Sequence, residues 1–142
     1  MSDETANIRK LAIAAYNLAF ELVVEGDQAQ LLEGLEQAAT SLNLWRKVGT
    51  DQNVSIGLWL YSRALAKAGA QALSIEAAAE AVRLAKLDGT DWLIASGYEG
   101  LARATQGTAS FEANRALATA AIDAIADAQD RALIASQFAD LA

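Results

Sequence analysis

The side chains best suited to chemistry are three cations close to one tryptophan. Trp59, Arg63 and Lys67 follow one another at intervals of four residues, which places them on one face of a helix. Arg103 stands 36 residues after Lys67 in a similar sequence context, so we expect the two cations to project from the same surface. An arginine and a lysine can bind a carboxylate while the indole packs on an apolar side chain. These residues predict a site for a peptide or partner protein. The alternative is that Arg63 and Lys67 are solvated and Trp59 lies half in the core.

Most catalytic and metal chemistry is excluded by composition. The chain has 142 residues, with no His and no Cys, so it has no histidine base, cysteine nucleophile, structural zinc site or disulfide. No glycine-rich phosphate loop is present. Asp123, Asp127 and Asp130 lack the loop spacing and turn glycine of a calcium site, and we expect Asp127 and Asp130 to cap the last helix. The sequence predicts no enzyme activity, no cofactor and no metal.

The charge pattern bears on partners and location. The formal net charge is −7, whereas proteins that bind nucleic acid need clustered Lys and Arg. The middle third, 46–103, is relatively basic between two acidic ends and can orient an acidic partner. The longest apolar stretch, Leu11 to Val24, is interrupted by Asn17 and Glu21 and is too short to span a bilayer. We expect a cytoplasmic protein with no nucleic-acid or membrane partner.

The periodicity of apolar residues predicts an all-α fold. Apolar residues recur at intervals of three and four throughout, and glycines punctuate these runs. Five glycines are expected to end helices in the left-handed conformation: Gly26, Gly49, Gly69, Gly89 and Gly107. Thr50 and Thr90 are expected to cap the helices that follow. The seven expected helices span residues 5–25, 28–48, 51–68, 72–87, 91–106, 109–126 and 128–141.

Internal similarity indicates helical repeats. The segment Leu65–Ala77 resembles Leu101–Ala113 at an offset of 36 residues without a gap, and a fainter copy lies upstream at an offset of 43. Because a single helical hairpin cannot bury its apolar face, stacking of hairpins would form the core. We expect one domain over 1–142, with repeats at about 5–48, 51–88 and 91–126 and a cap at 128–142 that buries Ile134, Phe138 and Leu141. Small side chains should let helices pack closely: Ala77, Ala78, Ala81 and Ala85 in one, and Ala113, Ala116, Ala120 and Ala124 in another.

Two passages carry a family resemblance. They are Leu65-Ala66-Lys67-Ala68-Gly69, followed by Ala81 and Leu84-Ala85, and Leu101-Ala102-Arg103-Ala104, followed by Gly107. The chain from Ile8 to Ala126 resembles tetratricopeptide-repeat (TPR) proteins of a divergent bacterial type. This resemblance implies an α-α superhelix of three TPR-like hairpins whose first helices line a concave face that binds peptides or partner proteins. It implies no enzyme activity and no cofactor.

The first helix carries two apolar stripes, where a surface helix needs one. One stripe is Ile8, Leu11, Ala15, Leu18 and Leu22, and the other is Ile13, Tyr16, Phe20 and Val24. The second stripe is expected to form a groove floor, a homodimer interface or the wall of a ligand cavity, or else to be buried in a thicker bundle. Three functions follow: a scaffold that binds a peptide, a self-associating helical protein, or a carrier that holds a small apolar ligand between Tyr16, Phe20 and Trp59.

Overall fold

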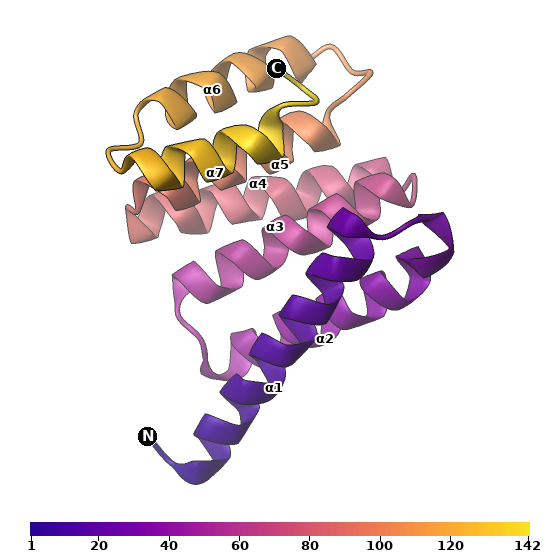
Figure 1. Ribbon diagram of the computed structural model, residues 1–142, viewed down its shortest axis with the longest axis vertical. Coiled ribbons are helices and arrows are strands. Elements are labelled where there is room, and N and C mark those ends of the chain that lie inside the picture. Colours follow the sequence, from indigo (N-terminus) through magenta and orange to yellow (C-terminus); the bar gives the residue numbers. More distant parts are fainter.

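The computed structural model describes residues 1–142 and consists of seven α-helices without a strand (Figure 1), which confirms the predicted all-α fold. A single π-helical turn, η1, extends the first helix, and a short 3-10 turn, η2, leads into the second. The elements are α1 (Asp3–Phe20), η1 (Glu21–Glu25), η2 (Gln28–Gln30), α2 (Leu31–Val48), α3 (Asp51–Lys67), α4 (Gln71–Asp88), α5 (Asp91–Ala104), α6 (Phe111–Asp123) and α7 (Ala128–Phe138). None of the helices is long and apolar enough to cross a membrane.

Consecutive helices form three antiparallel hairpins that stack side by side, α1 with α2, α3 with α4 and α5 with α6 (Figure 1). The first helix of the second and third hairpins packs on the second helix of the hairpin before it, so that α3 contacts α2 and α5 contacts α4. Helix α3 also contacts α5 directly, and α7 follows α5 and α6 at the C-terminal end. The first helices therefore lie in a row, and their C-terminal ends come together at one edge of the molecule.

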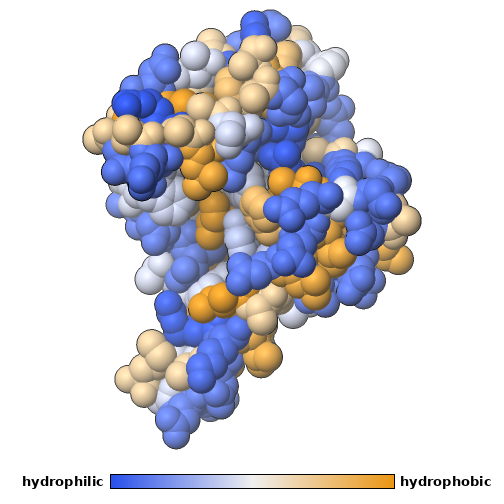
Figure 2. Space-filling view, in the orientation of Figure 1, coloured by the Kyte–Doolittle hydropathy of each residue, from blue (hydrophilic) through white to orange (hydrophobic).

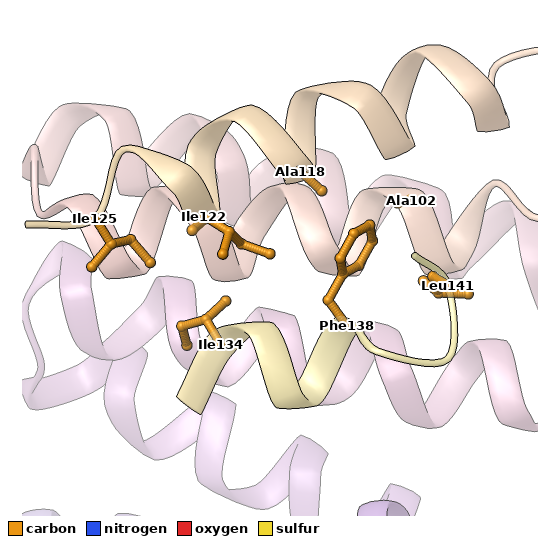
Figure 3. Close-up of a cluster of buried hydrophobic side chains, with 8 residues drawn as sticks. Ala102, Ala118, Ile122, Ile125, Ile134, Phe138 and Leu141 are labelled. Carbon is orange, nitrogen blue, oxygen red and sulfur yellow. The ribbon is translucent and has the colours of Figure 1, made fainter. Parts of the chain in front are cut away.

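The last helix closes the core as predicted. Ile134, Phe138 and Leu141 are all buried against side chains of α5 and α6, among them Ala118 and Ile122 (Figure 3). Leu141 lies just beyond the end of α7, where the chain turns back over the cluster. This packing fixes the C-terminal segment against α5.

The prediction for the alanine-rich helices is right for α4 and wrong for α6. The four alanines of α4 named in the prediction, including Ala78 and Ala81, are buried between α3 and α5. The four alanines of the second set are exposed, namely Ala113, Ala116 and Ala120 of α6 and Ala124 just after it. Helix α6 is the second helix of the third hairpin, and no other hairpin of the structure packs on its outer face. Helix α7 covers only the side of α6 that carries Ala118 and Ile122.

Glycine ends helices in two different ways. Gly69, Gly89 and Gly107 have φ near +80°, as predicted for left-handed helix ends. Gly26 and Gly49 do not, because their φ angles are −84° and −92°. A Cβ at Gly26 would overlap the carbonyl oxygen of Leu22, so close approach to the preceding turn, and not a positive φ, requires glycine there.

The predicted caps are mostly present. Thr50 forms a capping box with Asn53 at the start of α3, and the Asp127 carboxylate accepts from the backbone N–H of Asp130 at the start of α7. Thr90 occupies the expected position before α5, but its side chain makes no capping bond and donates instead to the carboxylate of Asp88.

Candidate functional site

A cleft of about 360 Å³ opens where the C-terminal ends of α1–η1, α3 and α5 meet. Three of the four residues predicted to bind a partner line it, namely Arg63, Lys67 and Arg103. The loop side of the cleft is formed by Gln71 and Gln106, and Val24 contributes an apolar wall. The repeat spacing therefore brings the predicted cations to one place, although each is held differently.

Trp59 does not line this cleft, contrary to the prediction for it. The residue is only 2% exposed, and its indole N–H donates to Oε1 of Glu99 at 2.8 Å. Gly100 of α5 passes so close that a Cβ at that position would lie 3.0 Å from the indole Cδ1. The indole is enclosed by its neighbours and supports the cleft from within, so it is unavailable to a ligand.

Glu99 is the residue at this site that sequence reasoning missed. It is fully buried and accepts from Trp59 through Oε1 and from Nε of Arg103 through Oε2, the latter at 2.9 Å. Nη1 of Arg63 lies 3.7 Å from Oε1. A buried carboxylate is tolerated only when it is paired in this way. Its sequence signal was available, because Glu99 precedes Arg103 by one helical turn and stands 36 residues after Arg63.

Arg103 makes four hydrogen bonds within the chain. Besides Glu99, it donates to both carboxylate oxygens of Asp140 at 2.8 and 2.9 Å and to the backbone oxygen of Gln137 at 3.0 Å. Burial lowers the pKa of Arg103, but the bond to Asp140 and the charge of Glu99 outweigh burial, and the pKa is raised overall. The hydrogen bond from Arg103 lowers the pKa of the Asp140 carboxyl. Arg103 therefore holds the chain end beyond α7 and has only one N–H, on Nη1, left for a ligand.

Lys67 caps the end of the first helix. Its ammonium donates to the backbone oxygens of Val23 at 3.0 Å and Gly26 at 2.8 Å. These carbonyls lie where the helix ends and the backbone is left without intrahelical partners, so a cation is favoured there. An ammonium has three donors, which leaves one N–H of Lys67 for a ligand in the cleft.

Arg63 has the one buried polar side-chain atom without a partner. Its side chain is 16% exposed, and Nη1 makes no hydrogen bond. The guanidinium lies over the indole of Trp59, with Cζ 5.9 Å from the ring centre. Burial and the nearby charge of Arg103 lower the pKa of Arg63, but an arginine stays protonated in proteins. A buried donor left unpaired costs about 1–3 kcal/mol. The rest of the guanidinium also makes no hydrogen bond within the chain, and Arg63 lines the cleft.

The predicted apolar face of the first helix is divided by the fold. Tyr16, Phe20 and Val24 are half-buried and pack on the cluster that contains Trp59, whereas Ile13 is exposed. The ring centres of Tyr16 and Phe20 lie 6.5 Å apart, and those of Phe20 and Trp59 lie 6.3 Å apart. Burial raises the pKa of Tyr16. The three rings contact one another in a row between α1 and α3, so they support the helix junction and offer no open wall to a carried ligand.

No group of three or more His, Cys, Asp or Glu side chains lies close enough to hold a metal ion. No protein-family model, no curated protein and no solved structure matches this chain.

Proposed function

We propose that this chain is an interaction module that binds an acidic segment of a partner protein, with one carboxylate of that segment held in the cleft beside Arg63 and Lys67. The proposal joins two independent lines. The sequence resembles TPR proteins, which implies peptide binding, and the predicted cations line one cleft in the fold. It assigns binding and not catalysis, because Arg103 and Glu99 are held in place by hydrogen bonds to other residues.

The observation that carries the proposal is the guanidinium of Arg63, which lines the cleft and makes no hydrogen bond within the chain. Of the three cations, Arg103 uses four of its five N–H groups and Lys67 two of its three within the chain, whereas no N–H group of Arg63 is hydrogen-bonded. The proposal therefore places the carboxylate on Arg63 and Lys67. Both belong to α3 and are one helical turn apart, a separation that suits the two oxygens of a carboxylate.

The charge of the cleft fits a single anionic group. Three cations face two carboxylates, Glu99 and Asp140, which leaves one positive charge in excess. The chain as a whole carries −7. A basic cleft in an acidic molecule selects an acidic side chain by local contact, while the overall charge disfavours non-specific binding to polyanions.

The test uses an array of 15-residue peptides rich in Asp and Glu, each paired with the same peptide carrying Asn and Gln. We expect the acidic peptides to bind the wild-type chain and the amide peptides to bind at least about tenfold more weakly, as loss of a hydrogen bond to a charged group predicts. Arg63→Ala should lower affinity by the same factor. Arg83→Ala, which removes an exposed arginine on α4, is the matched control and should leave binding unchanged.

Two results would contradict the proposal. One is equal binding of acidic and amide peptides, and the other is an Arg63→Ala variant that binds acidic peptides as tightly as the wild type. Arg63 is the better target than Lys67, because Lys67→Ala also uncaps η1 and would change the fold locally.

A further inference from the structure

The outer face of α1 is apolar and uncovered. Leu11 is 60% exposed and Leu18 is 37% exposed, and Ala14, also exposed, lies between them on the same side of the helix. Figure 2 shows hydrophobic surface interrupting the hydrophilic surface along α1. At the opposite end of the row of hairpins, α7 covers the core. The apolar surface is therefore covered at the C-terminal end of the molecule and exposed at the N-terminal end.

The offset between repeats identifies the residues of the other hairpins that are equivalent to this face of α1. Ala12 and Ser55 stand 43 residues apart, and both face the second helix of their own hairpin. The backbone oxygen of Ala12 accepts from Ser41 Oγ, and Ser55 Oγ donates to the backbone oxygen of Ala81. The same offset relates Ala14 to Gly57 and Leu18 to Tyr61.

The equivalent face of α3 and α5 is the one that docks on the preceding hairpin. A Cβ on Gly57 would lie 3.4 Å from Leu42 of α2, so this position faces α2. Gly97 stands 36 residues after Tyr61, and a Cβ there would lie 3.1 Å from Val82 of α4. Helix α1 thus carries the docking face of its repeat, and no other element of the structure covers Leu11, Ala14 and Leu18 on this face.

We infer that a second copy of this chain covers this face, with the two α1 helices antiparallel about a two-fold axis near Ala14. In this arrangement Leu11 packs on the partner's Leu18 and Leu18 on the partner's Leu11, and the small side chain of Ala14 lets the helices approach closely. Such an interface is self-complementary, as a two-fold dimer requires. The dimer face that the sequence suggested, Ile13 to Val24, is the wrong one, because most of it packs inside the molecule.

Charge selects the antiparallel arrangement. Lys10 and Glu21 are both exposed and lie on the same edge of the Leu11–Leu18 face, one residue before Leu11 and three after Leu18. An antiparallel pair brings each Lys10 next to the partner's Glu21, which gives two ion pairs. In a parallel pair the edges that carry Lys10 and Glu21 would lie on opposite sides of the interface, so the two residues would form no ion pair across it.

The first test is a site-specific crosslink. The chain has no cysteine, so Ala14→Cys provides a single thiol close to the proposed two-fold axis. Oxidation should convert Ala14→Cys to a covalent dimer, while Leu87→Cys, at a leucine of α4 that is 65% exposed, should remain uncrosslinked. Equal crosslinking of the two variants, or none at Ala14→Cys, would overturn the inference.

The second test measures mass in solution by sedimentation from about 1 to 100 μM, a range that covers ordinary dimer affinities. The wild type should be a dimer, and Leu18→Glu should weaken it at least about hundredfold by burying a charge. Leu87→Glu should leave the dimer unchanged, and circular dichroism confirms that each variant is folded. A monomeric wild type, or open-ended oligomers, would overturn the inference.

Charge reversal tests the orientation. Lys10→Glu should weaken the dimer about tenfold, since two ion pairs become two repulsive pairs. Adding Glu21→Lys to Lys10→Glu should restore the affinity, and a failure to restore it would overturn the antiparallel arrangement. Arg63→Ala should leave the mass unchanged, so loss of peptide binding and loss of the dimer remain separable.

Discussion

The two junctions between successive first helices are built from opposite chemistries. Between α1 and α3 the contact is aromatic, with Phe20 between Tyr16 and Trp59. Between α3 and α5 it is ionic: the buried carboxylate of Glu99, paired with Arg103 of its own helix α5, accepts from Trp59 and lies 3.7 Å from Arg63 of α3. Yet both junctions join helices of the same kind at the same place in their hairpins.

The offsets of the repeat make the contrast sharper. Phe20, Arg63 and Glu99 occupy one equivalent position, because they are separated by 43 and 36 residues. The stacking of hairpins thus accepts a ring, a cation or an anion at this position. The backbone arrangement follows from the small and apolar residues that all hairpins share, whereas the chemistry of each junction belongs to that junction alone.

Trp59 joins the two chemistries. Its ring faces Phe20 on the aromatic side, and its N–H donates to Glu99 on the ionic side. An apolar contact tolerates changes of shape that keep volume, while a buried ion network depends on the position of every donor. The two junctions should therefore respond differently to conservative substitutions.

The largest effect should come from Glu99→Ala. Removing this carboxylate leaves the indole N–H unpaired and Arg63 and Arg103 without their shared anion, and breaking a buried pair costs about 3–5 kcal/mol. Glu99→Asp should lose most of the same stability, since the shorter side chain cannot reach Trp59 and Arg103 together. Urea unfolding followed by circular dichroism measures both.

Glu112→Ala is the control for the ionic junction. Glu112 pairs with Arg115 on the surface of α6, and an exposed pair contributes about 0–1 kcal/mol. If Glu99→Ala and Glu112→Ala lowered the free energy of unfolding equally, the buried network would not hold α3 to α5.

Substitutions at the aromatic junction should lower the free energy of unfolding by an intermediate amount, and a substitution that keeps the side-chain volume should be tolerated. Phe20→Ala removes a half-buried ring from its place between Tyr16 and Trp59, and we expect a loss of about 2 kcal/mol, less than for a fully buried phenylalanine. Phe20→Leu keeps most of the volume and should cost under about 1.5 kcal/mol. The same urea experiment applies, and a Phe20→Leu variant as unstable as Phe20→Ala would show that ring geometry, and not burial, holds α1 to α3.

The fold was readable from the sequence because its signals are local. Helix periodicity, capping residues such as Thr50 and the glycines at φ near +80° act within a few residues of one another. The errors concern features decided by distant neighbours. Helices α4 and α6 are both rich in alanine, yet the alanines named in the prediction are buried in α4 and exposed in or just after α6. The difference arises because a further hairpin packs on α4 and none packs on α6.

The candidate site was predictable in part for the same reason. The repeat spacing correctly predicted that Arg63, Lys67 and Arg103 lie at one cleft. It did not predict which of their N–H groups form hydrogen bonds within the chain. The carbonyl that Lys67 caps lies 41 residues away in sequence, and the Asp140 that binds Arg103 lies 37 residues away. Pairings over such distances depend on the packed arrangement of the hairpins.

The smallest effect concerns the outer end of the ionic junction. Asp140 is exposed but binds Arg103 through both oxygens, so Asp140→Asn should cost under about 1 kcal/mol at neutral pH. Because Arg103 lowers the pKa of Asp140 in the folded chain, the stabilisation is present above the unfolded value of about 4 and is lost as the pH falls through the lower folded value.

The unfolding free energies of the wild type and Asp140→Asn should therefore differ at pH 7 and converge as the pH falls below about 4. Asp123→Asn, an exposed aspartate of α6 without a hydrogen bond or ion pair, is the matched control. Hydrogen exchange should locate the change in α7, where the amides of Ile134 and Phe138 lose protection in Asp140→Asn at neutral pH. A uniform loss of amide protection over all helices would mean that this ion pair supports the whole stack of hairpins. In that case the ionic junction extends from Arg63 to the chain end as one unit.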